Sequence, residues 1–242
     1  MQSNIYVSLS TQLALQRRME TIANNVANAM TAGFRAEEMT FEQIDSQTQR
    51  QAEPVSYVSR GLTRLSLAPG ELTQTSNPLD VAIRGNSFMA IQTGGGIAYT
   101  RDGRMQMLAT GQLTTLNGAP ILDISGSPLQ LDPNGGPPVF GKDGAITQNG
   151  RQFGAIGLFR MDSEARLTRG EGASVIPDIE PQPELDFNLN GVIQGFTEKS
   201  NVNPILEMTH LIAVQRTFEA VSNVIRDSEN SLQDAIKTLS GT

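Results

Sequence analysis

The sequence predicts an α+β fold, in which a helix at each end of the chain flanks a central antiparallel β domain. Apolar residues recur at helical spacing near both ends. The middle of the chain carries short apolar runs separated by turn dipeptides, which is typical of β-hairpins. Glycine (23 residues) and proline (12) are frequent and aromatic residues make up only 5%, so the composition favours a layered or elongated body over one dense globule.

The N-terminal helix is expected within residues 1–35. Four apolar residues there follow one another at steps of four, three and four, which places them on one stripe of a helix: Leu15, Met19, Ile22 and Val26. Gly33 is the predicted C-cap, because glycine readily adopts the left-handed conformation that ends many helices.

Two connectors are expected, at residues 36–76 and 186–200. The first is polar and rich in Gln, Thr and Ser, so it is predicted to be extended. A chain that runs helix, extended arm, β domain, extended arm and helix must bring its two ends together or leave both apolar stripes unburied. We therefore expect the terminal helices to pair.

The antiparallel β domain is expected over residues 77–185. Turn dipeptides that accept positive φ angles recur in and just after it: Asp102-Gly103, Asn117-Gly118, Asn134-Gly135, Asp143-Gly144, Asn149-Gly150 and Asn190-Gly191. The run Gly94-Gly95-Gly96 lacks the spacing of a phosphate-binding loop, and no helical pattern follows it, so it is predicted to be a hairpin turn.

The C-terminal helix is expected within residues 201–242. Its apolar residues recur every seventh position, with a second set three residues later, which is a heptad pattern: Leu211, Phe218, Ile225, Leu232 and Leu239, with Val214 and Val221. Pro204 suits the first turn, Asn203 is the candidate N-cap, and Glu207 completes something close to a capping box. The pattern predicts a coiled-coil-like pair with the N-terminal helix; ordinary packing within one chain is the alternative.

Composition and charge exclude several classes of function. The formal net charge is −7 with no cluster of Lys and Arg, so nucleic-acid binding is not expected. The chain has no cysteine, which excludes disulfides and thiolate metal sites. Residues 1–20 lack the pattern of a cleaved signal peptide and no apolar run would span a bilayer, so neither a leader nor membrane insertion is expected.

No catalytic or metal site is predicted, and no cofactor is expected. The single histidine, His210, lies beside a heptad position and is predicted to face solvent. Residues 132–143 resemble a calcium-binding loop only faintly, because Pro137 stands where that loop needs glycine and Asp143 where it needs glutamate. The sequence therefore predicts a protein that is not an enzyme.

Five stretches together resemble the axial proteins of the bacterial flagellar rod and hook, and among them the proximal rod proteins. They are ANNVANAMTAGFR (23–35), PGELTQTSNPLDVAIRGNSFMAI (69–91), YTRDGRM (99–105), GQLTTLNG (111–118) and KSNVNPILEMTHLIAVQRTFEA (199–220). They occur in the family's order and include both ends and the middle of the chain. The short length, and Phe218 where distal rod proteins usually have tyrosine, favour the proximal rod; a distal rod protein is the related alternative.

The resemblance implies a structural subunit that polymerises axially into a hollow tube, transmits torque and encloses the export channel. The terminal helices would form its inner layer. It also implies export by the flagellar type III apparatus without a cleaved signal, a place in the periplasmic rod, and three kinds of partner: other rod proteins, copies or homologues of the chain, and the export machinery. A secreted β-domain binding module with coiled-coil oligomerisation ends is the alternative from a different class.

Subunit contacts are expected from both helices and the motifs beside them. The candidate residues are Leu15, Met19, Ile22, Asn24, Asn25, Val26, Asn28, Gly33, Phe34, Asn201, Asn203, Glu207, Met208, Leu211, Val214, Gln215, Arg216, Phe218, Glu219, Val221, Ile225, Leu232 and Leu239.

Three asparagines stand close together inside the predicted N-terminal helix, although asparagine is a mediocre helix former. In a tube, a helix has neighbours on several sides, so amides off its apolar stripe become buried. A buried amide without a partner costs about 1–3 kcal/mol, so such amides favour one register between subunits. We therefore expect Asn24, Asn25 and Asn28 to specify subunit register; the alternative is that they face water.

Overall fold

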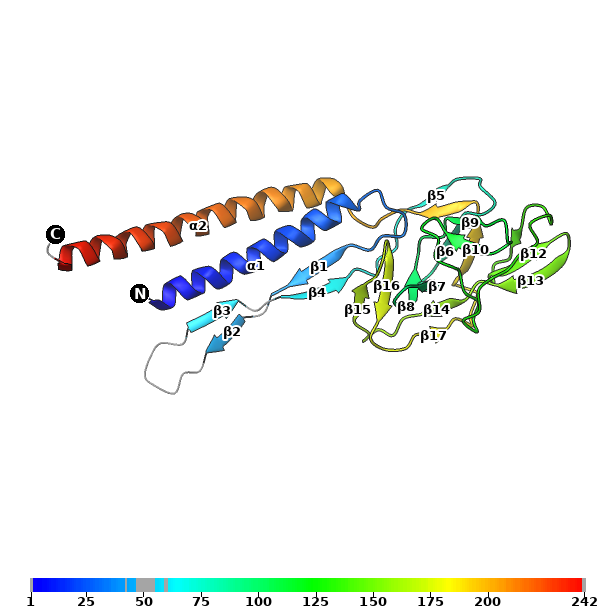
Figure 1. Cartoon of the computed structure of the whole chain (residues 1–242), viewed down its shortest axis with the longest axis horizontal. Coiled ribbons are helices and arrows are strands. Elements are labelled where there is room, and N and C mark those ends of the chain that lie inside the picture. Colours follow the sequence, from blue (N-terminus) through cyan, green and yellow to red (C-terminus); the bar gives the residue numbers. More distant parts are fainter. Residues whose placement is uncertain (1, 42, 47–54, 59–60, 241–242) are drawn as a thin grey trace. The chain divides into compact units, whose positions relative to one another are not determined.

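The computed structural model describes residues 2–41, 43–46, 55–58 and 61–240, and Figure 1 shows the order of their helices and strands. The fold is α+β, as predicted. The chain divides into two compact units. We call them the helical unit, made of Met1–Ala27, Glu37–Arg64 and Asn203–Thr242, and the β unit, made of Asn28–Ala36 and Leu65–Val202.

The helical unit is built on α1 (Gln2–Ala27) and α2 (Pro204–Ser240), which lie side by side (Figure 1). Gln12 on α1 donates a hydrogen bond to Ser222 on α2 at 3.3 Å. Four short strands complete the unit in two pairs, β1 (Glu37–Thr40) with β4 (Leu62–Leu65) and β2 (Gln43–Ser46) antiparallel to β3 (Val55–Val58).

The main sheet of the β unit has six antiparallel strands in the order β15-β16-β8-β7-β14-β17. Their bounds are β7 Ser87–Thr93, β8 Gly96–Thr100, β14 Leu158–Arg160, β15 Leu167–Arg169, β16 Ser174–Pro177 and β17 Gln182–Pro183. Smaller antiparallel sheets join β6 to β18, β5 to β19, β9 to β10, and β11 to β12 and β13. Their bounds are β5 Leu72–Gln74, β6 Val81–Arg84, β9 Met105–Met107, β10 Leu113–Thr115, β11 Val139–Phe140, β12 Ala145–Gln148, β13 Arg151–Ala155, β18 Gly191–Gln194 and β19 Phe196–Glu198.

Strand β7 lies in the middle of this sheet, and both its faces are buried. Successive side chains of a strand point to opposite faces, so Met89 and Ile91 enter one apolar cluster while Phe88 and Ala90 enter another. The continuous apolar run in the sequence is therefore what a central strand covered on both sides requires. The larger cluster also holds Leu113, Ile121, Ile146 and Leu158, among others, all almost fully buried.

Several hairpin predictions are confirmed. Asn149 (φ 49°) and Gly150 (φ 78°) form the two-residue turn between β12 and β13, where both positions need a positive φ. Gly94 and Gly95 form the turn between β7 and β8, whose last pair is Thr93 with Gly96.

The predicted C-cap at Gly33 is wrong, because α1 ends at Ala27, six residues earlier. Asn28 explains why the helix ends early. The Asn28 carbonyl accepts the backbone N–H of Thr31 at 3.0 Å, and the Asn28 side chain accepts the Thr31 hydroxyl at 3.2 Å, so the chain turns there instead of continuing the helix. Gly33 does have a positive φ of 68°, at a point where the chain lies close to the Asp102 backbone.

Strands occupy much of both predicted connectors. Residues 36–76 contain β1 to β5, and residues 186–200 contain β18 and β19. The parts of the first connector at residue 42 and at 47–54 and 59–60 lie outside the described residues.

Candidate functional site

The predicted apolar rows of the two helices are partly covered within this one chain. On α1, Ile22 is buried, while Leu15, Met19 and Val26 are half-buried. On α2, Val214 is buried, and the half-buried members of the row are Leu211, Phe218, Val221 and Ile225. The side chains of Leu232 and Leu239 lie outside the described part of the chain. The pairing of α1 with α2 therefore leaves much of both rows accessible.

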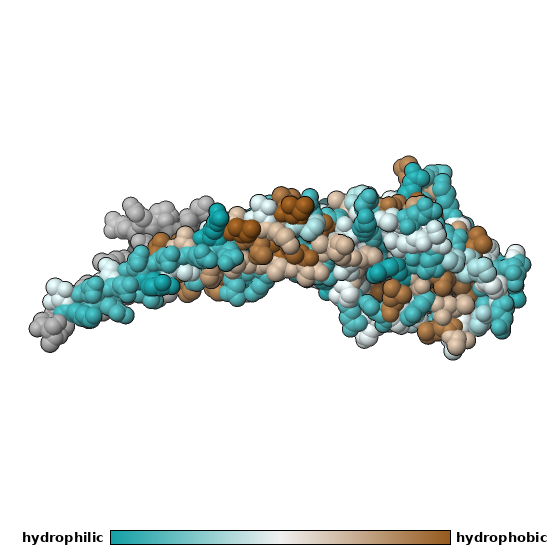
Figure 2. All heavy atoms as spheres, turned by 90° about the horizontal axis from the view of Figure 1, so that it is seen from above, coloured by the Kyte–Doolittle hydropathy of each residue, from teal (hydrophilic) through white to brown (hydrophobic). Residues whose placement is uncertain are grey.

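A second apolar row on α2 is exposed. Ile205 is 78% exposed, Met208 52% and Ile212 54%, at a spacing of three and four residues that places them on one stripe of the helix. Figure 2 shows apolar side chains gathered on the helical unit. The polar candidates Gln215, Arg216 and Glu219 are also exposed on α2, where Gln215 donates to Glu219 at 3.3 Å.

Asn25 fastens β1 to α1. Its side-chain oxygen accepts the backbone N–H of Glu37 at 2.9 Å, and its side-chain nitrogen donates to the Glu37 carbonyl at 2.9 Å. The same nitrogen also donates to the Glu207 carboxylate on α2 at 3.4 Å. Asn25 is almost fully buried, so its amide is already satisfied inside its own chain. A role in register between subunits stays a prediction for Asn25, and equally for Asn24 and Asn28, which are half-buried.

Asn203 is the N-cap of α2, as predicted. Its side-chain oxygen accepts the backbone N–H groups of Ile205 at 3.1 Å and Leu206 at 3.2 Å. The predicted capping box is wrong, because the Glu207 carboxylate faces Asn25 and lies 3.8 Å from His210 instead of returning to Asn203. His210 is 45% exposed at its side chain, which confirms that it faces solvent.

Asn201 holds three backbone segments of the β unit together. Its side-chain oxygen accepts the N–H of Ala36 at 2.7 Å, and its side-chain nitrogen donates to the carbonyls of Ser66 at 3.2 Å and Ala68 at 2.9 Å. Phe34, two residues before Ala36, is fully buried beneath the Arg169 guanidinium, 4.0 Å from the ring centroid. Both predicted contact residues therefore have structural roles in their own chain.

Gly33 is required by close approach of two backbones. A Cβ there would lie 2.3 Å from the backbone nitrogen of Asp102, far inside contact distance. Its own N–H donates to the Glu198 carbonyl at 2.8 Å. Gly33 therefore allows the segment after α1 to pack directly against the rest of the β unit.

Beside Gly33 lies a buried ion cluster that we call the Arg–Glu–Arg cluster, made of Arg35, Glu198 and Arg101. Arg35 Nη2 is 2.8 Å from Glu198 Oε1, and Arg101 Nε is 2.7 Å from Glu198 Oε2. The two arginine side chains are 2% exposed and the glutamate is fully buried. The Glu198 carboxylate on β19 thus connects Arg35, which follows α1, to Arg101, which directly follows β8.

The remaining donors of the cluster bind mostly backbone oxygens. Arg101 donates to the carbonyls of Ile83, Gly85 and Ser87 at 2.6–2.7 Å, while Arg35 donates to the Ala68 carbonyl at 2.6 Å. The Gly70 N–H donates to Glu198 at 2.7 Å. Burial, together with repulsion from Arg101, lowers the pKa of Arg35 to about 10, and burial also lowers the pKa of Arg101.

The sequence does not predict this cluster. Arg35 and Arg101 are in two of the stretches that carry the family resemblance, but nothing links them to Glu198, which is 97 residues from Arg101. A local signal does exist: Arg101 directly follows β8 and Glu198 is the last residue of β19, and the other residues of both strands are uncharged. A charge in such a place is costly unless it is paired.

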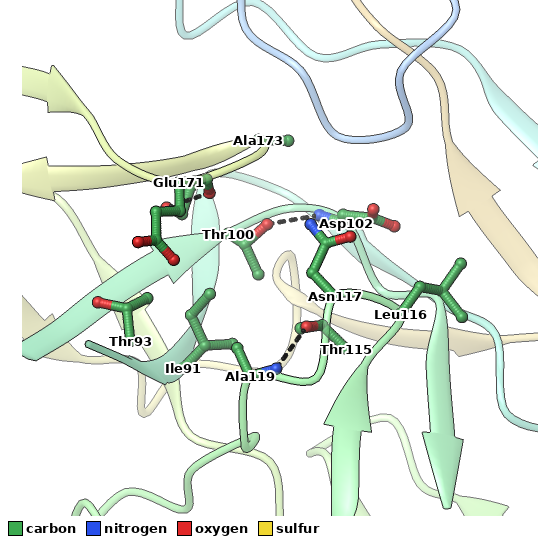
Figure 3. A pocket seen from close by; sticks show the side chains of 11 residues that line it. Ile91, Thr93, Thr100, Asp102, Thr115, Leu116, Asn117, Ala119, Glu171 and Ala173 are labelled. Carbon is green, nitrogen blue, oxygen red and sulfur yellow. Dashed lines mark hydrogen bonds between the residues drawn. The ribbon is translucent and has the colours of Figure 1, made fainter. Parts of the chain in front are cut away.

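No catalytic arrangement is found in the described part of the chain. A small cavity of about 60 Å³ in the β unit is lined by Thr100, Asp102, Thr115, Asn117 and other side chains (Figure 3). The hydroxyl oxygens of Thr100 and Thr115 already accept hydrogen bonds within the chain. Thr100 accepts the N–H of Asp102 at 3.0 Å, and Thr115 accepts the N–H of Ala119 at 3.1 Å. Among the described residues no three ionisable side chains are placed to hold a metal ion. No described helix has the length and apolar character needed to cross a membrane.

Three family descriptions match successive parts of the chain. Residues 5–35 match the flagella basal body rod proteins, residues 82–148 the D1 domain of the flagellar hook proteins FlgE/F/G, and residues 193–238 the C-terminal segment of the flagellar basal body rod FlgEFG proteins. The first match ends at Arg35 and the third includes Glu198, so both contribute to the Arg–Glu–Arg cluster.

Curated relatives match over their whole length. The chain is 47% identical to the flagellar basal-body rod protein FlgF of Mesorhizobium japonicum over 99% of this chain and 98% of the relative. It is 46% identical to FlgF of Rhizobium meliloti over 100% of both chains. Identity to the rod protein FlgG of Buchnera aphidicola from Schizaphis graminum is 32%, over 95% of this chain and 97% of the relative.

The predicted absence of enzymatic activity is confirmed by these relatives, which are structural proteins of the flagellar rod. The order of the three matches, the identity and the coverage agree with one another. The chain belongs to the family of flagellar basal-body rod proteins and is a FlgF-like member of it.

Proposed function

We propose that the chain is a structural subunit of the flagellar basal-body rod and acts by packing against other rod subunits. The observation that supports it most directly is the exposed row Ile205, Met208 and Ile212 on α2, which lies in a protein of the rod family. Exposed apolar rows of this kind mark surfaces that a neighbouring subunit covers. Identities of 46–47% to two proteins named FlgF, over nearly the full length of both chains, favour the FlgF branch.

Within this role, we assign α1 and α2 to a coiled-coil-like pair in the inner layer of the rod. The heptad row on α2 and its half-burial against α1 support the pairing. We retain the proposed division of the chain into an N-terminal segment at 1–35 whose helix ends at Ala27, a connector at 36–76, a β domain at 77–185, a return connector at 186–200 and a C-terminal helical segment at 201–242. The two helices would together enclose the export channel and transmit torque.

Assembly would be head to tail, because repeated heterologous contacts generate a helical array while a two-fold pair closes on itself. The partners would be copies or homologues of the chain and the neighbouring rod proteins. We further propose export by the flagellar type III machinery without a cleaved signal, and a final place in the periplasmic rod. Asn24, Asn25 and Asn28 would then set the register between subunits, and Gln215, Arg216 and Glu219 would take part in subunit contacts.

We also propose that the helices are largely unfolded in the free chain and fold as the subunit assembles. Isolated helices are marginal in water, and α2 exposes apolar residues on the side away from the heptad row. Folding on assembly would suit passage through a narrow channel.

The direct test is replacement of Ile205 and Ile212 together by glutamine in a strain that lacks the wild-type protein. Both side chains are exposed, so the free chain should keep its β unit, but rods beyond their base and swimming should be lost. Thr217→Gln, at an exposed polar position of the same helix, is the control and should behave as wild type. Full rods and normal swimming with the double substitution would refute the role assigned to this row.

A further inference from the structure

A cavity of about 170 Å³ opens in the β unit beside the Arg–Glu–Arg cluster. Three arginines line it, Arg35 and Arg101 from the cluster and Arg160 at the end of β14. Its other lining residues are uncharged: Leu67, Asn86, Phe88, Met161 and Ser163. The cavity wall thus carries three cationic side chains and no acidic one.

The buried charges next to the cavity do not balance. Glu198 is the carboxylate that pairs with both Arg35 and Arg101, and its Oε1 also accepts the N–H of Gly70. Two buried guanidinium groups therefore share one negative charge. The repulsion between Arg35 and Arg101 contributes to the lowered pKa of Arg35, which agrees with a local excess of positive charge.

Hydrogen-bond donors are also left over. Arg35 Nε is buried and has no hydrogen-bond partner. The Arg160 guanidinium, which is exposed, makes no hydrogen bond or ion pair with any other described residue. Guanidinium groups present a planar fork of donors that matches the two oxygens of a carboxylate.

We propose that this cavity receives the carboxylate of an aspartate or glutamate side chain from a neighbouring rod subunit. The proposal rests on the rod function proposed above, and it names a contact outside the helices. The chain supplies the complementary charge itself, because its 25 acidic residues outnumber its 18 Lys and Arg residues. A copy or homologue therefore offers many carboxylates, and one of them would balance the charge and bind Arg160.

The test is charge reversal at Arg160, whose exposed guanidinium makes no hydrogen bond or ion pair with another described residue. We expect Arg160→Glu to fold and to be exported, but to enter rods about tenfold less than wild type, because a like charge would face the incoming carboxylate. Arg160→Lys should restore most incorporation. Arg166→Glu, at an exposed arginine that does not line the cavity, is the matched control and should enter rods normally. Incorporation of Arg160→Glu at the wild-type level would overturn the proposal.

A second measurement separates a protein carboxylate from a free one. Sodium acetate is titrated into the purified wild-type chain against sodium chloride at equal ionic strength, with the arginine Nε–Hε NMR signals as the readout. Acetate that saturates these signals while Arg160→Glu still assembles would assign the site to a free carboxylate and overturn the proposed source. The rod function itself is tested separately by the Ile205 and Ile212 substitutions, so the two can fail independently.

Discussion

The helical unit and the β unit bury their apolar residues to very different degrees. In the β unit, two apolar clusters and the Arg–Glu–Arg cluster are shielded within one chain. In the helical unit only Ala14, Ile22 and Val214 are buried apolar side chains among those described, and α2 exposes a further apolar row. The difference indicates that the β unit is stable by itself, whereas the helices need neighbours to complete their packing.

The largest effect on stability is expected from Glu198→Gln in the β unit. The substitution leaves two buried guanidinium groups without a charge partner, and breaking a buried ion pair in this way costs about 3–5 kcal/mol. Urea unfolding followed by circular dichroism measures the change. Glu71→Gln removes the exposed pair with Lys199 and should leave the unfolding midpoint unchanged. An equal, small effect of both would contradict the structural role of the cluster.

The second-largest effect is expected from substitutions that create a cavity, and it should differ between the two units. Leu113 is fully buried in the larger cluster, so Leu113→Ala should lower the free energy of unfolding by about 2–5 kcal/mol. Leu211 on α2 is only half-buried, and Leu211→Ala should cost the free chain clearly less while it weakens incorporation into rods. Equal destabilisation of the free chain by both substitutions would contradict the difference in packing between the two units.

Substitutions at two glycines with positive φ test how closely the segment after α1 packs against the rest of the β unit. The added Cβ of Gly118→Ala (φ 84°) would meet open space, so the substitution should cost only conformational strain of about 1–3 kcal/mol. Gly33→Ala should cost more, because its Cβ also collides with the Asp102 backbone. Thermal unfolding of the two variants gives the order, and a Gly33→Ala protein at least as stable as Gly118→Ala would be inconsistent with this packing.

The smaller effects concern single polar contacts of the helical unit. Asn25→Ala removes the two hydrogen bonds that the almost fully buried Asn25 amide makes with the Glu37 backbone, at a cost of about 1–3 kcal/mol. Asn203→Ala removes the N-cap of α2, at a cost of about 1 kcal/mol. Helix content by circular dichroism of assembled rods reports both, and the reverse order would show that the Asn25 contacts are weak.

The features that the sequence predicted correctly depend on local signals. Apolar spacing predicts α1 and α2, and dipeptides such as Asn149-Gly150 predict hairpins, because each signal lies within a few neighbouring residues. The positions of Gly33 and Asn25 were misjudged or left open because their partners, Asp102 and Glu37, are brought near only by the fold. The Arg–Glu–Arg cluster escaped prediction for the same reason, since Arg35, Arg101 and Glu198 come from three separate parts of the chain.

Amide hydrogen exchange, measured on the free chain and on assembled rods, tests the contrast between the two units most directly. The amides of β7 and β8 should be strongly protected in both samples, because these strands lie in the buried sheet. The amides of α1 and α2 should exchange rapidly in the free chain and slowly in rods. Helix amides as strongly protected in the free chain as those of β7 would contradict the account.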